Sequence, residues 1–365
     1  MSPTRPPRIG LVGVGTLGAR HAQALATLAH GAAAPLAFAG VYDLREARAQ
    51  AATEAHGVPA FANRAALLEA VDGVVVATPT VGHREVALAA IAAGCDVFVE
   101  KPIADSAEAG RAILDAAIAA GRGVWVGHSE RFNPAVRAAA GVAKRPRFIE
   151  ARRLAGFSPR ATDVDVVLDL MIHDIDLALA LTGERPSRVE AIGVAVLTES
   201  EDLANARLEF PSGTVASLTA SRVSPERLRK LRVFSDHAYL SLDLLTGRAE
   251  AAITDRKRLA EAALVFAQHA AHAAGTVTTA PATMPDWTDL LERSVLEVAD
   301  PGAQPLMLEL AAFAAALGGT SRPGPGGEAA PGRFGLATGE DGLAALEVAE
   351  DVRRAMRERA ARWPA

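Results

Sequence analysis

The chain has 365 residues, half of them hydrophobic and 22% charged, which excludes wholesale disorder and predicts roughly two domains. The net charge of −5, without a basic stripe, gives no indication of a nucleic-acid partner. The single cysteine, Cys95, excludes an internal disulfide and fits a reducing compartment.

The first third of the sequence alternates apolar strands with alanine-rich helices. Strands are expected at 8–14, 36–42, 73–77, 96–99 and 124–126, and helices at 16–30, 44–56, 81–93 and 106–120. Continuous apolar strands joined by helices are typical of a parallel sheet covered on both faces.

The pattern changes after this region. A strand is expected at 147–154 and a long helix at 165–181, and several short strand-like segments follow between 188 and 245. Turn residues separate these segments, which predicts an antiparallel sheet and a second domain of the α+β class.

The last hundred residues differ in composition from the rest. The stretch 262–285 is rich in Ala and Thr with little periodicity, and 321–333 is rich in Pro and Gly. Both are expected to be weakly ordered. A charged amphipathic helix is expected at 340–357.

No segment of the sequence predicts export or a membrane span. The apolar run at 8–14 follows two arginines, but glycines interrupt it. The uncharged stretch 22–42 is mostly Ala and contains His30, Gly31 and Pro35, so a helix, a turn and a strand fit it better. We expect a cytoplasmic protein without a membrane partner.

Residues 13–18 read G-V-G-T-L-G, between a predicted strand and a predicted helix. In a dinucleotide-binding loop Gly13 makes the tight turn, Gly15 lets the backbone approach a pyrophosphate, and Gly18 permits close helix–strand packing. Thr16 and Leu17 open the helix whose N-terminus faces the anion. The context favours dinucleotide binding over an ordinary glycine-rich turn.

An acidic residue follows the second predicted strand. Asp43 lies 25 residues beyond Gly18, near the spacing of about 20 at which such folds place a carboxylate on the ribose 2′-hydroxyl. A carboxylate there repels a 2′-phosphate, so NAD is favoured over NADP. The neighbouring Arg45 weakens this preference.

Two further strand ends carry polar residues, at the edge where ligands bind such sheets. Thr78 and Pro79, followed by His83, come after one strand, and Glu100 and Lys101 after another. Lys101 is one of only four lysines among 38 basic residues. Burial can depress the pKa of a lysine and suit it to proton transfer. A solvated surface lysine is the alternative.

The helix at 165–181 contains Asp169, His173 and Asp176 within an apolar context. Their spacing of four and three residues places them on one face of an α-helix. A carboxylate one turn from an imidazole can orient it and stabilise its charged form, as a general base requires. The alternative is a hydrogen-bonded histidine at a domain surface. A metal site is not expected, because no cysteine or second histidine lies nearby.

With these motifs the chain resembles the Gfo/Idh/MocA family of NAD(P)-dependent sugar and cyclitol oxidoreductases. The resemblance rests on the glycine loop, ATP at 77–79, EKP at 100–102, D-x-x-x-H-D at 169–174 and GEDGLAALEVAEDV at 339–352.

The resemblance implies an α/β Rossmann domain over 1–125 that binds NAD. An α+β domain over 126–365 would follow, with a large, mostly antiparallel open sheet for substrate binding and for assembly into a homodimer or homotetramer. The helix at 340–357 would pack back on the first domain.

Matched position by position, the resemblance implies that Lys101 lies near the nicotinamide and the reacting hydroxyl. His173 would be the acid/base, Asp169 its partner and Asp43 the ribose-binding acid, and either His173 or Lys101 would take the hydroxyl proton. Thr78, Pro79, His83 and Glu100 would border the cofactor.

A narrower resemblance, carried by residues 130–134 and 157–174, is to the branch that acts on UDP-N-acetylglucosamine. Those enzymes oxidise the sugar 3-hydroxyl to a ketone on the route to a 2,3-diamino lipid A. Arginines suit the diphosphate, and Asn suits hydroxyls or the acetamide. The candidate substrate residues are Arg131, Asn133, Arg153, Ser158, Arg160 and Asp176. Ordinary surface arginines are the alternative in so arginine-rich a chain.

Two other functions stay open. The chain could be another dehydrogenase of the family that acts on myo-inositol, a free sugar or a UDP-hexuronate. It could also be a regulator that binds NAD without turnover, although the intact Lys101, Asp169 and His173 argue against that.

Overall fold

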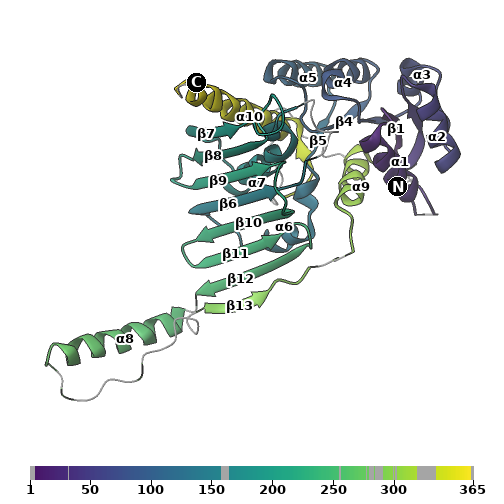
Figure 1. Ribbon diagram of the computed structural model, residues 1–365. Helices are drawn as coiled ribbons and strands as arrows, with labels where there is room; N and C mark the ends of the chain where they lie inside the picture. The colour runs from purple at the N-terminus through teal and green to yellow at the C-terminus, as the bar shows by residue number, and fades with distance from the viewer. Residues whose placement is uncertain are drawn as a thin grey trace.

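In the computed structural model, residues 5–31, 33–157, 164–254, 256–276, 278, 283, 291–298, 300, 302–318 and 334–362 are described. Figure 1 shows two sheets side by side, with helices on both faces of one and mainly on one face of the other.

The first sheet forms as the sequence predicts. Its strands are β1 (Arg8–Val12), β2 (Ala37–Tyr42), β3 (Gly73–Val76), β4 (Asp96–Glu100) and β5 (Val124–Gly127). They pair in parallel in the order β5-β4-β3-β1-β2. β3, β4 and β5 are buried along their whole length, because helices cover both faces of the sheet.

Four of the connecting helices lie within two residues of the expected ranges, and a further short helix at 64–69 is not among those expected. They are α1 (Thr16–Leu28), α2 (Glu46–His56), α3 (Arg64–Glu69), α4 (His83–Ala92) and α5 (Ala107–Ala120). The Ser106 hydroxyl caps α5 by accepting from the Ala109 N–H. Gly57 and Gly121 end α2 and α5 in the left-handed conformation that favours glycine.

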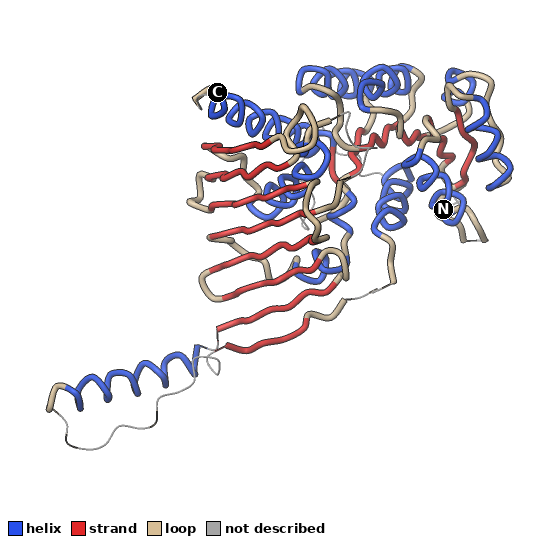
Figure 2. The backbone as a smooth tube through the Cα atoms, viewed as in Figure 1, coloured by secondary structure: helices blue, strands red, loops and turns tan. Residues whose placement is uncertain are grey.

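The second sheet has eight strands and is mostly antiparallel, which confirms the expected fold class. Its strands are β6 (Phe148–Leu154), β7 (Arg188–Val194), β8 (Leu203–Glu209), β9 (Val215–Ser221), β10 (Leu228–Ser235), β11 (Ala238–Asp243), β12 (Arg248–Thr254) and β13 (Leu291–Val295). Their order is β13-β12-β11-β10-β6-β9-β8-β7, and only β6 and β9 run parallel among these described strands. Figure 2 shows this sheet as a broad ladder beside the first.

The expected helix at 165–181 is split in two. Val167–Met171 is a π-helical turn, and α7 (Ile172–Thr182) continues it as an α-helix. Spacing in the sequence does not reveal this change of register. The short helix α6 (Pro134–Ala139) lies against β11 and β12 on the same side of the sheet.

The expectation of weak order from residue 262 onward is wrong over its first part. α8 (Arg256–Ala273) is a helix that projects beyond the sheet (Figure 1). Alanine has the highest intrinsic helix propensity, so an alanine-rich stretch can be helical without an amphipathic period. The rest of that stretch and residues 321–333 lie largely or wholly outside the described residues.

The chain returns to the first domain after residue 305. The expected division into 1–125 and 126–365 does not include this return. α9 (Pro305–Gly318) packs on α1, and its Phe313 ring lies 5.6 Å from Phe98 and 5.4 Å from Trp125 between centroids. β14 (Ala337–Thr338) adds an antiparallel strand beside β5.

The last helix, α10 (Gly339–Ala360), contacts both domains. It packs against α5 and β5 of the first and against α7 and β7 of the second. Thr338 and Asp341 form a capping box at its start. The α10 contacts therefore fix α7, with His173, against the end of the first sheet.

Candidate active site

The three glycines of the loop differ in how much room a side chain would have. Gly13 has a φ of +93°, and a Cβ there would lie 2.8 Å from the Ala77 carbonyl oxygen. A Cβ on Gly18 would lie 2.0 Å from the Gly13 oxygen. Gly15 is different, because the nearest atom to its Cβ position is Arg48 Nη1 at 3.7 Å. Gly13 and Gly18 are thus required by the fold itself, whereas Gly15 leaves space above the loop.

The start of α1 fits an anionic cofactor. Gly15 is the N-cap, and no side chain caps the helix, so the N–H groups of its first turn, from Thr16 and Leu17 onward, meet no capping side chain. An uncapped N-terminus with a cation beside it is a site for a pyrophosphate. Arg48, on the first turn of α2, supplies that cation, and the sequence analysis missed it because no motif marks its position.

Asp43 lies directly after β2, as the sequence predicts. Its Oδ2 accepts from the Val14 N–H at 2.6 Å and its Oδ1 from the Arg45 N–H at 2.8 Å. These bonds hold the carboxylate against the glycine loop at the start of α2. Each oxygen keeps a second lone pair that a ribose hydroxyl could use.

The strand-end residues of β3 and β4 are tied to one another. His83, almost wholly buried, lies 2.9 Å from the Pro102 oxygen through Nδ1 and 3.0 Å from the Thr78 oxygen through Nε2. Burial lowers the pKa of His83, so the ring is neutral and donates to one of these carbonyls. His83 therefore lies between the end of β3, with Thr78 and Pro79, and the loop after Lys101.

Glu100 is held by a buried histidine. The Glu100 Oε1 lies 2.6 Å from His21 Nε2, and its Oε2 accepts from the Lys101 N–H at 3.1 Å. Burial alone would raise the pKa of Glu100, but the hydrogen bond and charge of His21 lower it. The resulting carboxylate fixes the backbone at the point where the Lys101 side chain leaves the sheet.

Lys101 reaches the helix that carries His173. Its Nζ donates to the Asp169 carbonyl at 2.7 Å and to the Leu168 carbonyl at 3.4 Å, and Asp169 Oδ1 lies 4.0 Å away. Both carbonyls lie in the π-turn, where the Ile172 N–H bonds Val167 five residues back. π-turns are frequent at functional sites. Burial lowers the pKa of Lys101, and Asp169 and Glu100 oppose the shift.

His173 lies among cations. Burial lowers its pKa well below the usual value, and the charges of Lys101, Arg153, His128 and Arg229 lower it further. Its Nδ1 is buried and has no hydrogen-bond partner among the described residues. A carboxylate that stabilises a charged imidazole is therefore not seen among the described residues, because the Asp169 carboxylate lies 4.0 Å from the Lys101 ammonium instead.

Two of the predicted substrate arginines have internal partners. Arg153, 2% exposed, donates to both oxygens of Asp174 at 2.8 and 3.0 Å and to Glu130 at 2.8 Å. Arg131, 4% exposed, donates to both oxygens of Asp176 and to Asp341. These bonds satisfy the buried cations, so neither arginine fits the expected contact with a substrate phosphate.

Of the remaining predicted substrate residues, two also have partners inside the protein and two lie outside the described residues. Asn133 donates to Glu130 and to the Leu244 carbonyl, and its side-chain oxygen accepts from the Ala135 N–H at the start of α6. Asp176 is 1% exposed, and its carboxylate accepts from Arg131. Ser158 and Arg160 lie outside the described residues.

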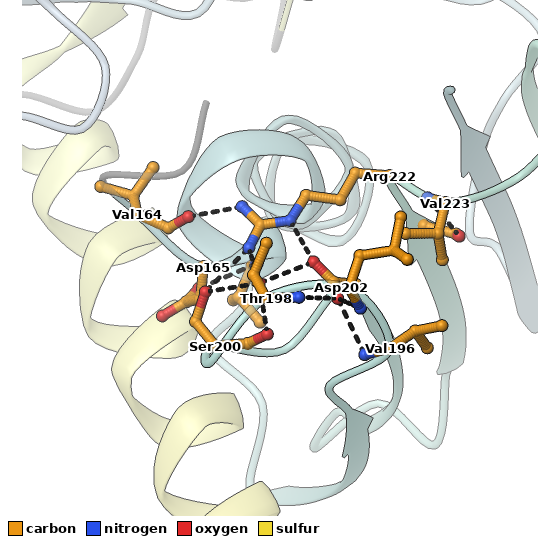
Figure 3. Close-up of polar contacts among 11 residues, drawn as sticks. Val164, Asp165, Val196, Thr198, Ser200, Asp202, Arg222 and Val223 are labelled. Atoms are coloured by element: carbon orange, nitrogen blue, oxygen red, sulfur yellow. Dashed lines mark hydrogen bonds and ion pairs between the residues drawn. The ribbon is translucent and has the colours of Figure 1, made fainter. Parts of the chain in front are cut away.

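A buried cluster fixes the start of the π-turn (Figure 3). Asp202 accepts from Arg222 at 2.8 Å and from three N–H groups of residues 196–198. These bonds overcome its burial and hold the pKa of Asp202 below the ordinary range. Arg222 also donates to the Val164 carbonyl at 2.7 Å. The adjacent Asp165 carboxylate caps the turn by accepting from the Val167 and Leu168 N–H groups.

α9 carries a further buried acidic residue, Glu309. Glu309 is fully buried, and neither of its carboxyl oxygens has a hydrogen-bond partner within the described part of the chain. Burial raises the pKa of Glu309 well above its usual value, and the charges of Glu100 and Asp176 add to the shift. No sequence motif singles out this residue.

The described residues contain no group of three or more His, Cys, Asp or Glu side chains that could hold a metal ion. They also contain no helix that is both long and apolar enough to cross a bilayer.

The chain matches two family models. Residues 7–128 match the oxidoreductase family GFO_IDH_MocA with an NAD-binding Rossmann fold, and residues 136–241 match the GFO/IDH/MocA C-terminal domain.

Similar proteins of known name include a UDP-N-acetylglucosamine 3-dehydrogenase from Acidithiobacillus ferrooxidans, 41% identical over 65% of this chain and 74% of that protein. An inositol 2-dehydrogenase from Saccharopolyspora erythraea is 36% identical over 48% of this chain and 54% of its own length. Among solved structures, the UDP-N-acetylglucosamine 3-dehydrogenase GnnA from A. ferrooxidans has a TM-score of 0.78 and 31% identity, covering 96% of this chain and 98% of that one. The chain therefore belongs to the Gfo/Idh/MocA family and is an NAD(P)-dependent oxidoreductase that acts on sugar hydroxyls.

Proposed function

We propose that this enzyme oxidises the 3-hydroxyl of UDP-N-acetylglucosamine to a ketone, with NAD as the hydride acceptor, on a route to 2,3-diamino lipid A. The observation that carries the proposal is a neutral His173 beside a Lys101 cation at the carboxyl edge of the Rossmann sheet. The similarity to a UDP-N-acetylglucosamine 3-dehydrogenase supports the substrate.

In this reaction His173 is the base. Because its pKa is lowered, the imidazole is neutral at pH 7 and can accept the hydroxyl proton. The same lowered pKa lets the ring pass the proton on to solvent after each turnover. The bound nicotinamide supplies the hydride-accepting carbon.

Lys101 stabilises the developing alkoxide. An ammonium has three N–H donors, and two of them point to the Leu168 and Asp169 carbonyls. The third is left for the substrate oxygen. The carbonyl contacts and Asp169 Oδ1 keep the ammonium in place, so little reorganisation is needed as charge develops.

The cofactor is held by Gly15, Thr16, Leu17 and Arg48 at the pyrophosphate and by Asp43 at the ribose. Asp43 favours NAD because its carboxylate repels a 2′-phosphate, whereas the neighbouring Arg45 favours NADP. The test is the ratio of kcat/KM for NAD to that for NADP. A ratio in favour of NADP contradicts the role of Asp43.

The substrate is tested by NADH formation with UDP-N-acetylglucosamine, its uronate, myo-inositol and free hexoses. Turnover of myo-inositol without turnover of the UDP-sugar contradicts the proposed substrate and favours the inositol dehydrogenases among the relatives. A protein that binds NAD but reduces none with any sugar is a regulator.

We also propose that the protein is a homodimer or homotetramer formed through the uncovered face of the second sheet. That face carries a row of rings, Phe148, Phe234 and Tyr239, with centroids 5.8 and 4.9 Å apart. Phe234 and Val295 are exposed there beside a groove of about 680 Å³. Light scattering of the wild type and of Phe234→Glu tests this: a monomer in both contradicts it.

A further inference from the structure

A substrate that carries a diphosphate needs cations to bind its phosphates. Arg131 and Arg153 cannot serve, because both are bound to buried carboxylates, so the phosphate-binding cations must lie elsewhere. A groove of about 980 Å³ lies between α1, the turn after β5, β10 and α9. Its lining includes Arg20, Gln23, Ser129, Arg229, Asp300 and Leu306. The volume is in the range of about 300–1,000 Å³ that is usual for small-molecule sites.

Arg229 is the cation on the β10 side of the groove. It lies opposite Arg153 in the pairing of β10 with β6, and its side chain is 37% exposed. Its contact with Glu130 is 3.3 Å long, and Glu130 already accepts from Arg153 and Asn133 at 2.8 and 3.0 Å. Arg229 is therefore only weakly neutralised by the protein.

Arg229 is linked to the helix of His173 through Arg153, its partner across β10 and β6, which donates to Asp174. The positive charge of Arg229 lowers the pKa values of both Lys101 and His173. The Arg229 end of the groove therefore faces the part of the fold that holds the His173 helix, and the rest of the lining follows α1 and α9.

The other walls suit a nucleoside diphosphate. Arg20 and Gln23 are exposed on α1 within two turns of the glycine loop. Asp300 can accept hydrogen bonds from ribose hydroxyls, and Leu28 and Leu306 give apolar contact for a base. Guanidinium groups match phosphate oxygens in geometry as well as in charge.

We propose that this groove is the subsite for the nucleoside diphosphate part of the substrate, with Arg229 as its main phosphate-binding residue and Arg20 as the second. The assignment rests on the proposed UDP-sugar function and adds residues that the sequence analysis did not select. It explains why Arg229, a cation that shares its one carboxylate partner among the described residues with Arg153, is kept on this side of the sheet. A bound phosphate provides the counter-charge.

The experiment is calorimetric titration of the full-length protein with UDP, which contains the diphosphate but no reacting sugar. Arg229→Gln should raise the Kd for UDP about 10- to 100-fold, as loss of a charge-assisted hydrogen bond predicts. Arg229→Lys should restore part of the affinity, and Arg20→Gln should raise the Kd about 3- to 10-fold.

Arg207→Gln is the matched control. Arg207 lies on β8 in the same sheet and contacts Glu209 at 3.3 Å, the distance at which Arg229 contacts Glu130. It does not line the groove, because β9 and β6 lie between β8 and β10 in the sheet. It should leave the Kd for UDP unchanged. The Kd for NAD should be unchanged in all four variants, which shows that they fold.

The outcomes separate the two proposals. Turnover of UDP-N-acetylglucosamine with equal Kd values for UDP in the wild type, Arg229→Gln and Arg20→Gln overturns the subsite and leaves the function intact. A wild type that neither binds UDP nor oxidises the UDP-sugar overturns both. A raised KM for the UDP-sugar in Arg229→Gln, with the Kd for UDP raised in parallel, supports the subsite.

Discussion

Glu309 allows a quantitative test of the buried electrostatics behind the site. The side chain is fully buried on α9 without a hydrogen-bond partner among the described residues, and burial raises its pKa well above the usual value. The folded protein therefore holds a proton on Glu309 at pH values where the unfolded chain has released it. Replacing it by Gln keeps the shape and removes the titration.

The magnitude follows from linkage. An unfolded Glu has a pKa of about 4.3, so below that pH both states bind the proton and the full stability is present. As the pH rises from there toward the raised folded pKa, only the folded state keeps the proton. The free energy of unfolding then falls by about 1.4 kcal/mol per pH unit from this one residue.

The assay is urea unfolding of the wild type and Glu309→Gln between pH 5 and pH 7. All other titrating groups are common to both proteins, so the difference between them isolates Glu309. We expect Glu309→Gln to gain stability on the wild type as the pH rises from 5, by up to about 1.4 kcal/mol per pH unit until the raised pKa of the folded state is reached. A difference that does not change with pH contradicts a protonated Glu309.

The remaining predictions concern the loop and the catalytic pair. Gly18→Ala should destabilise the protein by about 3 kcal/mol, because its Cβ would meet the Gly13 oxygen at 2.0 Å. Gly15→Ala should change stability by less than about 1 kcal/mol and raise the Kd for NAD. Equal melting temperatures for the two variants would contradict this difference. Lys101→Ala should lower kcat about 100-fold or more with the Kd for NAD nearly unchanged, and near-normal turnover would refute its role. Because the pKa of His173 is lowered, kcat/KM should stay high as the pH falls through 6.5, where an ordinary histidine becomes protonated, and an acid limb centred at or above 6.5 argues against His173 as the base.

Much of the first domain could be predicted because its signals are local. The buried apolar strands, Ser106 at the start of α5 and the glycines that end α2 and α5 act within a few residues of themselves. The requirement for Gly18 is also local, since it faces the Gly13 oxygen within one loop. The helical period of α8 was hidden by its alanine content, and the expectation of weak order failed there.

The candidate site was predicted in part. The sequence indicated Lys101, Asp169 and His173 by type and by resemblance, and the structure brings Lys101 to the Asp169 backbone. The pairing of Asp169 with His173 assumed a regular α-helix. The π-turn changes the register at that point, and the Asp169 contacts go to Lys101 instead.

The sequence by itself determined the parallel sheet, the glycine loop, the acidic residue after β2 and the residue types at the strand ends, because short-range sterics and periodicity govern them. Only the tertiary structure decided which arginines bind carboxylates, since Arg153 meets Asp174 and Glu130 across strands and helices more than 20 residues away in sequence. It also decided that Glu309 is buried and that Arg229 lines a groove, because burial and the balance of charge depend on the whole fold.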